Sequence, residues 1–121
     1  MVKVLVVDDE LSVREIFSLA LRFAGCEVIE AEDGELAVEA LTRESFDVMI
    51  IDLRMPNLNG REVVHRVRNG DLPLNTSIKI ITTSADELSA DDELRKLATV
   101  VLCKPIDVVK LRDMVTGFEF A

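Results

Sequence analysis

The feature of this 121-residue sequence that most limits its fold is a pattern repeated five times along the chain. Each repeat begins with a short run of β-branched or other apolar residues. It continues with a stretch in which apolar positions fall three and four residues apart. The apolar runs lie at residues 4–7, 27–31, 48–51, 78–82 and 100–102. Strands that alternate with helices in this way predict an α/β domain.

The helices predicted after these strands differ in how clearly the sequence marks them. In the first, apolar residues keep helical spacing from position 13 to position 24, and Gly25 then ends the helix. Shorter repeats of the same kind predict a second helix around 36–41, a third around 63–67 and a fifth around 108–115. The fourth predicted helix, at 86–97, is more polar than the others.

The first and third apolar runs carry almost no polar residues, which is typical of parallel strands covered by helices on both faces. Because crossover connections are right-handed, five βα units of this length favour the flavodoxin-like doubly wound sheet with strand order 2-1-3-4-5. In that order the first and third strands are neighbours, and their carboxyl ends meet in one crevice. The length fits a single domain over residues 1–121.

Composition excludes some classes of function. The chain is 49% hydrophobic, too apolar for a disordered tail, and its formal net charge of −9 disfavours direct contact with nucleic acid or an anionic membrane. Cys26 and Cys103 lack the spacing of a metal or redox motif, so we expect reduced core residues and a cytoplasmic protein. No signal peptide or membrane segment is expected at the amino end.

Acidic residues follow the two strands that should be neighbours. The first strand ends in Asp8-Asp9, with Glu10 next, and the third ends in Asp52. Carboxylates brought this close repel one another unless a cation neutralises them, and Mg²⁺ prefers such oxygen ligands. The alternative is that Asp8 and Asp9 only cap the first helix.

Hydroxyl side chains end the fourth strand. The third strand is followed by a loop at 53–60 rich in turn-forming residues, and the fourth strand ends in Thr82-Thr83-Ser84-Ala85. One of these hydroxyls could donate a hydrogen bond to a phosphoryl oxygen at the same edge of the sheet. The alternative is plain β-propensity, because threonine is common in strands.

A lysine follows the fifth strand. Pro105 restricts the preceding residue, Lys104, to an extended conformation and so fixes the direction of its side chain. At the edge where Asp52 is expected, the Lys104 ammonium can pair with that carboxylate or with a phosphate on it.

Together these features resemble the receiver domain of two-component response regulators, of the chemotaxis-regulator type, along essentially the whole chain. The residues that carry the resemblance are Asp8-Asp9, Asp52, Met55-Pro56 through Gly60, Ser84-Ala85 and Lys104-Pro105. The match rests on five separated features in one order, which makes an accidental resemblance improbable.

The resemblance implies a phosphoacceptor and a metal site. Asp52 would accept a phosphoryl group. Asp8, Asp9 and Asp52, with the backbone carbonyl of Arg54, would bind Mg²⁺. The donor would be a sensor histidine kinase or phosphotransfer protein, so the domain would be a signalling switch that assists its own modification and not an enzyme with a separate substrate.

The resemblance also implies how the switch works. Ser84, or alternatively Thr83, would bind the phosphoryl group, and Lys104 would pair with it. Phosphorylation would then change a protein-binding surface formed by the fourth helix, the fifth strand and the fifth helix. The family often has an aromatic residue where this chain has Val101, so the signal should leave the site mainly through the hydroxyl and its loop. We expect no effector domain after the fifth helix.

Two rival interpretations remain open at this point. Aspartate-nucleophile phosphatases also use Mg²⁺, but they carry a second aspartate two positions after the nucleophile, where this chain has Arg54. A receiver-like module that has lost phosphorylation would not need the complete acidic set.

Arg54 and Asp86 could pair across the phosphoryl group and slow its hydrolysis, or could be two solvated charges.

Overall fold

The computed structural model describes residues 1–55, 57–85 and 92–118. At its centre is a five-stranded parallel sheet with the order β2-β1-β3-β4-β5, which confirms the predicted topology. The strands are β1 (Lys3–Val7), β2 (Glu27–Ala31), β3 (Val48–Asp52), β4 (Lys79–Ser84) and β5 (Val100–Cys103).

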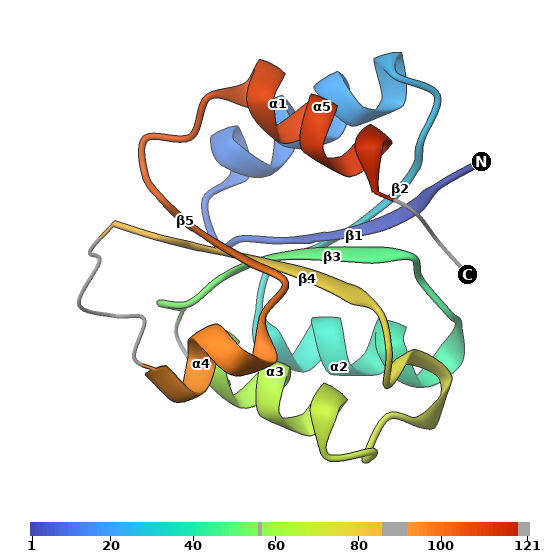
Figure 1. Cartoon of the computed structure of the whole chain (residues 1–121), viewed down its shortest axis with the longest axis vertical. Coiled ribbons are helices and arrows are strands. Elements are labelled where there is room, and N and C mark those ends of the chain that lie inside the picture. Colours follow the sequence, from blue (N-terminus) through green and yellow to red (C-terminus); the bar gives the residue numbers. More distant parts are fainter. Residues whose placement is uncertain (56, 86–91, 119–121) are drawn as a thin grey trace.

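Helices cover both faces of the sheet, as expected for a doubly wound fold. They are α1 (Leu11–Phe23), α2 (Gly34–Arg43), α3 (Gly60–Arg68), α4 (Asp92–Leu97) and α5 (Val108–Gly117), with a short 3-10 helix at Pro73–Asn75. Figure 1 shows α1 and α5 on one face and α2, α3 and α4 on the other. The flavodoxin-like fold class is therefore confirmed.

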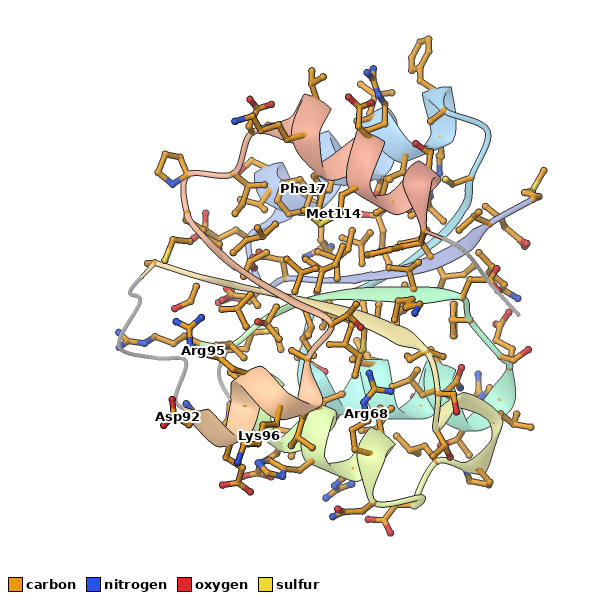
Figure 2. All side chains as sticks on the ribbon, viewed as in Figure 1. Phe17, Arg68, Asp92, Arg95, Lys96 and Met114 are labelled. Carbon is orange, nitrogen blue, oxygen red and sulfur yellow. The ribbon has the colours of Figure 1, made fainter. Side chains whose placement is uncertain are left out.

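The sheet separates two apolar cores, because alternate side chains of each strand point to opposite faces. Leu5, Met49 and Ile80 belong to the core that lies against α2, α3 and α4. The other core packs against α1 and α5. Figure 2 shows Phe17 of α1 and Met114 of α5 within this second layer.

Asparagine and aspartate side chains fix where several helices begin. The Asp33 carboxylate accepts a hydrogen bond from the Leu36 amide at the start of α2, and the Asn59 side chain accepts one from Glu62 at the start of α3. Such bonds satisfy amides that have no partner within the first turn of a helix. Asn59 is therefore the N-cap of α3, and Gly60 is its first residue.

β4 ends at Ser84, so the hydroxyl residues lie at the end of the fourth strand, as the sequence predicted. Two other expectations need comment. Cys103 is exposed and is not a core residue, because it ends the edge strand β5, whereas Cys26 is buried as expected. Of the fourth helix predicted at 86–97, the structure gives residues 92–97, and residues 86–91 lie outside the described chain.

No helix formed by the described residues has both the length and the apolar character needed to span a membrane.

Candidate functional site

Three carboxylates meet at the carboxyl edge of the sheet. Asp52 is the last residue of β3, and Asp8 and Asp9 follow β1, the neighbouring strand. One oxygen from each carboxylate can be chosen so that all three lie within 4.8 Å of one another. Asp8 and Asp52 are buried, whereas Asp9 is exposed. The topology thus brings together the acidic residues that the sequence singled out.

Lys104 enters the same site from β5, which is separated from β3 by β4. Its ammonium nitrogen lies 3.2 Å from Asp8 Oδ2 and 3.2 Å from Asp52 Oδ2. The Lys104 side chain is 21% exposed, so the charge is partly withdrawn from water. One cation therefore links the carboxylates at the ends of β1 and β3.

The electrostatics of the site follow from this geometry. Burial raises the pKa of Asp52 above its usual value, and the Asp8 charge adds to the effect, while the Arg54 amide and the Lys104 ammonium oppose it. Burial alone would lower the pKa of Lys104, but Asp52 and Asp8 outweigh it and the pKa is raised. The lysine stays charged, and Asp52 is a more basic carboxylate than a solvated one.

The turn between β1 and α1 shows that the acidic pair does not cap the first helix. The N-cap of α1 is Glu10, which makes no side-chain capping bond. Asp8 Oδ1 instead accepts a hydrogen bond from the Glu10 amide at 2.9 Å, ahead of the helix. Capping as the only role of Asp8 and Asp9 is therefore wrong, and the Asp9 carboxylate faces the site from an exposed position.

The segment after β3 packs closely against the end of that strand. The Arg54 amide donates to Asp52 Oδ1 at 3.2 Å, a contact that places the Arg54 backbone beside the carboxylate. Gly60 at the start of α3 lies against the same strand: a Cβ there would approach the Asp52 carbonyl oxygen to 2.1 Å. Only glycine permits this approach. The sequence suggested the glycine as a turn residue and gave no sign of this packing.

Strand alternation separates the two candidate hydroxyls. Thr83 is the register partner of Asp52 and lies two residues after Ile81, which packs in the core under α1 and α5. Ser84 falls on the opposite face, the face of α3 and α4. Both are buried, and within the described chain the Thr83 hydroxyl has no hydrogen-bond partner.

Some sequence-based expectations for the site are not tested by the structure. Pro56 and Asp86 lie outside the described residues, so the pairing of Arg54 with Asp86 stays a prediction. The peptide bond between Lys104 and Pro105 is cis, which the sequence did not reveal, since most such bonds are trans.

Comparison with known proteins agrees with this geometry. Residues 4–116 match the family profile described as response regulator receiver domain. This chain belongs to that family. Receiver domains are signalling switches of two-component systems and bind Mg²⁺ at a cluster of aspartates. The cluster at the ends of β1 and β3 has the carboxylate ligands that such an ion needs.

Solved structures show the same fold over nearly the whole chain. A CheY-like receiver domain from Methylobacillus flagellatus superposes with a TM-score of 0.88, at 26% identity, over 98% of this chain and 99% of that one. The response regulator TrrA of Thermotoga maritima, solved in complex with Mg²⁺ and BeF, gives a TM-score of 0.84 at 30% identity over 96% and 97% of the two chains.

Curated relatives differ in length from this chain. Sporulation initiation phosphotransferase F of Bacillus subtilis is 28% identical over 96% of this chain and 92% of its own length. The probable transcriptional regulatory protein TcrX of Mycobacterium tuberculosis is 41% identical over 75 residues, which cover 60% of this chain but 32% of that protein. The chain spans about two fifths of two further relatives.

Proposed function

We propose that Asp52 accepts a phosphoryl group from a phosphohistidine on a partner kinase or phosphotransfer protein. The observation that carries this proposal is the position of the Lys104 ammonium, 3.2 Å from both the Asp52 and the Asp8 carboxylates. Asp52 is buried at the end of a wholly buried strand, and its oxygens face this cation and the acidic pair. A nucleophile, a fixed positive charge and a cluster of metal ligands thus share one site.

Asp8, Asp9 and Asp52 would hold Mg²⁺, with the Arg54 backbone carbonyl as a further ligand. Their carboxylate oxygens suit this hard cation, and Asp9 is exposed enough to keep part of the ion's water shell. Bound there, the ion would neutralise charge on the phosphoryl oxygens. The relative TrrA, solved in complex with Mg²⁺ and BeF, supports this assignment by analogy.

In the proposed transfer, a carboxylate oxygen of Asp52 forms a bond to phosphorus as the bond to the donor's imidazole nitrogen breaks. Lys104 moves its pairing from the carboxylates to the phosphoryl oxygens, a short displacement for a long side chain. The raised pKa of Asp52 favours a more nucleophilic oxygen. The product is the modified domain itself, so the chain acts as a switch and turns over no separate substrate.

Ser84 is the hydroxyl we assign to the phosphoryl group, with Thr83 as the alternative. Ser84 is the last residue of β4 and lies on the face of the sheet that α3 and α4 cover. Thr83 sits one residue deeper, on the α1 and α5 face. A hydroxyl at the strand end that turns toward the phosphate would pull on the segment leading to α4, which is how phosphorylation would reach the surface of α4, β5 and α5.

The donor would approach over the end of α1. An apolar hollow of about 460 Å³ lies beside Lys104, lined on the α1 side by Val13, Ile16 and Phe17 and on the other by Pro105, Ile106 and Val108. Because Lys104 lines both this hollow and the acidic site, a protein that brings a phosphohistidine to Asp52 would also cover the hollow. Burying it would supply affinity, while the Lys104 ammonium and a bound cation would attract the phosphoryl group.

Two rival functions are less well supported. At the position two after Asp52, where an aspartate-nucleophile phosphatase needs an acid, this chain has the exposed Arg54. A module that has lost phosphorylation has no need to keep three carboxylates together with a lysine paired to two of them. The net charge of −9 argues against direct binding to nucleic acid. Reduced Cys26 and Cys103 fit a cytoplasmic protein, and the chain length fits a single receiver domain.

Intact-mass spectrometry after incubation with a small phosphodonor and Mg²⁺ tests the proposal. Wild type should gain one phosphate, and Asp52→Asn should gain none. Asp47→Asn is a matched control at the amino end of the same strand, where Asp47 Oδ2 accepts from the Lys3 amide and an asparagine oxygen can do the same. An adduct on Asp52→Asn, or none on wild type, would overturn the assignment.

A further inference from the structure

Arg14 makes a contact that the proposed phosphoryl transfer does not account for. One terminal nitrogen of its guanidinium donates to the backbone carbonyl of Asp8 at 2.8 Å. Its Nε lies 3.5 Å from Glu30 Oε1, at the carboxyl end of β2. The Arg14 side chain is only 12% exposed, so a long cation has been buried against the acidic turn.

The Asp8 carbonyl that Arg14 holds belongs to the peptide bond between Asp8 and Asp9. Other bonds already fix Asp8: its amide donates to the Ala31 carbonyl at 3.2 Å, and its carboxylate accepts from the Glu10 amide and pairs with Lys104. The contact with Arg14 fixes the plane of the next peptide, and that plane, together with the φ angle of Asp9, sets the direction in which the Asp9 side chain leaves the backbone.

Three adjacent acidic residues need such a restraint, because mutual repulsion favours turns that spread their carboxylates apart. Asp9 is exposed, so packing does little to hold it. The charge of Arg14 is partly balanced by Glu30, and its contribution at the site is therefore mainly the hydrogen bond to the Asp8 carbonyl.

We infer that Arg14 is a positioning residue for the metal site: it fixes the peptide between Asp8 and Asp9 so that the Asp9 carboxylate stays near Asp52 before a cation binds. This inference rests on the proposed function. Residues that orient metal ligands typically change affinity by about 10- to 100-fold when they are removed.

Arg22 provides a matched control within the same helix. Its guanidinium donates to the Val28 carbonyl at 3.2 Å and lies 3.5 Å from Glu30 Oε2. Both arginines therefore join α1 to β2 through Glu30 at 3.5 Å, and each also donates to a backbone carbonyl, that of Asp8 in the turn after β1 for Arg14 and that of Val28 in β2 for Arg22. Only Arg14 touches the acidic turn, so a purely structural role in holding α1 on the sheet would affect both variants.

The experiment compares Arg14→Met and Arg22→Met, each of which keeps the apolar stem and removes the donors. Mg²⁺ affinity is measured by amide chemical-shift titration of the unphosphorylated protein, and exchange of the Glu10 amide is measured without metal. Arg14→Met should weaken Mg²⁺ binding about tenfold and speed Glu10 exchange. Arg22→Met should bind Mg²⁺ within about twofold of wild type, and Arg14→Lys, which keeps the charge, should lie between wild type and Arg14→Met.

Each outcome bears on the inference separately from the proposed function. If wild type binds Mg²⁺ and is phosphorylated on Asp52, but Arg14→Met matches Arg22→Met, the positioning role is wrong and the function stands. Tighter Mg²⁺ binding by Arg14→Met would mean that charge repulsion dominates, which also overturns the role. If Arg14→Met does not fold, the comparison of Arg14→Lys with wild type decides. A wild type that neither binds Mg²⁺ nor gains phosphate overturns both.

Discussion

The strands that carry the carboxylates are buried more deeply than the strand that carries Lys104. Every residue of β3 is buried, as are the last four residues of β1. No residue of β5 is fully buried, and Cys103 at its end is exposed. Figure 1 shows β1 and β3 inside the sheet, with helices on both sides. Asp8 and Asp52 thus lie at the ends of the most buried strands of the sheet, and Lys104 comes from its edge.

The helices differ in the same way: α1 is long and well packed, whereas the described part of α4 is short and mostly exposed. α1 has 13 residues and packs on β2 and α5, whereas the described part of α4 has six residues, of which only Leu94 is buried. Arg68 of α3, labelled in Figure 2, donates to the Leu97 carbonyl at 2.9 Å and ties the end of α4 to its neighbour. Segments with little buried apolar surface open at lower free energy, so the α4 and β5 side should open more easily than the α1 side.

Matched valine truncations should give the largest difference between the two regions. Val6 in β1 is 0% exposed, and Val6→Ala removes two fully buried methyl groups, which should lower the free energy of unfolding by about 2 kcal/mol. Val101 in β5 is only half-buried, and Val101→Ala should cost less than about 1 kcal/mol. Urea denaturation measures both. Equal losses would contradict the contrast in burial.

The sequence predicted the acidic site well because its residues follow strands whose order is limited by chain connectivity. Once β1 and β3 are neighbours, Asp8, Asp9 and Asp52 share an edge whatever the detailed packing. Apolar strands with helical stretches between them are enough to predict that order. The reach of Lys104 across β4 followed from the resemblance and from its place after the last strand.

Other features depend on packing between segments far apart in the sequence. Gly60 had a turn-like local context, but its role comes from the approach of α3 to the Asp52 carbonyl. The sequence did not predict the contact of Arg14, because the first helix is predicted from its apolar spacing and the partner of Arg14 is a backbone carbonyl. Cys103 was misplaced because the sequence does not show how well α4 and α5 cover the edge strand.

Mg²⁺ should stabilise the folded protein, because only the folded chain brings the carboxylates of Asp8, Asp9 and Asp52 together. At ten times its dissociation constant the ion should add about 1.4 kcal/mol to the free energy of unfolding. Asp9→Ala should remove most of this gain, while Asp71→Ala, in the exposed turn after α3, should keep it. Melting temperatures with and without Mg²⁺ provide the measurement. A gain unchanged in Asp9→Ala would place the ion elsewhere.

The smallest effect should appear in how stability depends on pH without metal. Burial raises the pKa of Asp52 above the ordinary value of 3.8, so the folded state holds this proton more tightly than the unfolded state. The stabilising contribution is present below pH 3.8 and is lost as the pH rises through the folded pKa. Asp52→Asn cannot titrate, so its stability relative to wild type should increase across that window and then level off.

Lys104→Met separates the effect of the lysine on the pKa of Asp52 from the effect of burial. The Lys104 ammonium lowers the pKa of Asp52 and so limits the loss of stability, which is why the wild-type effect should be small. Without that ammonium, the Asp52 carboxylate is buried beside Asp8 with no cation in contact, and its pKa should rise further. The decline in stability should then be larger and extend to higher pH. If Lys104→Met and wild type have the same pH profile, Lys104 does not set the charge of the buried Asp52 carboxylate.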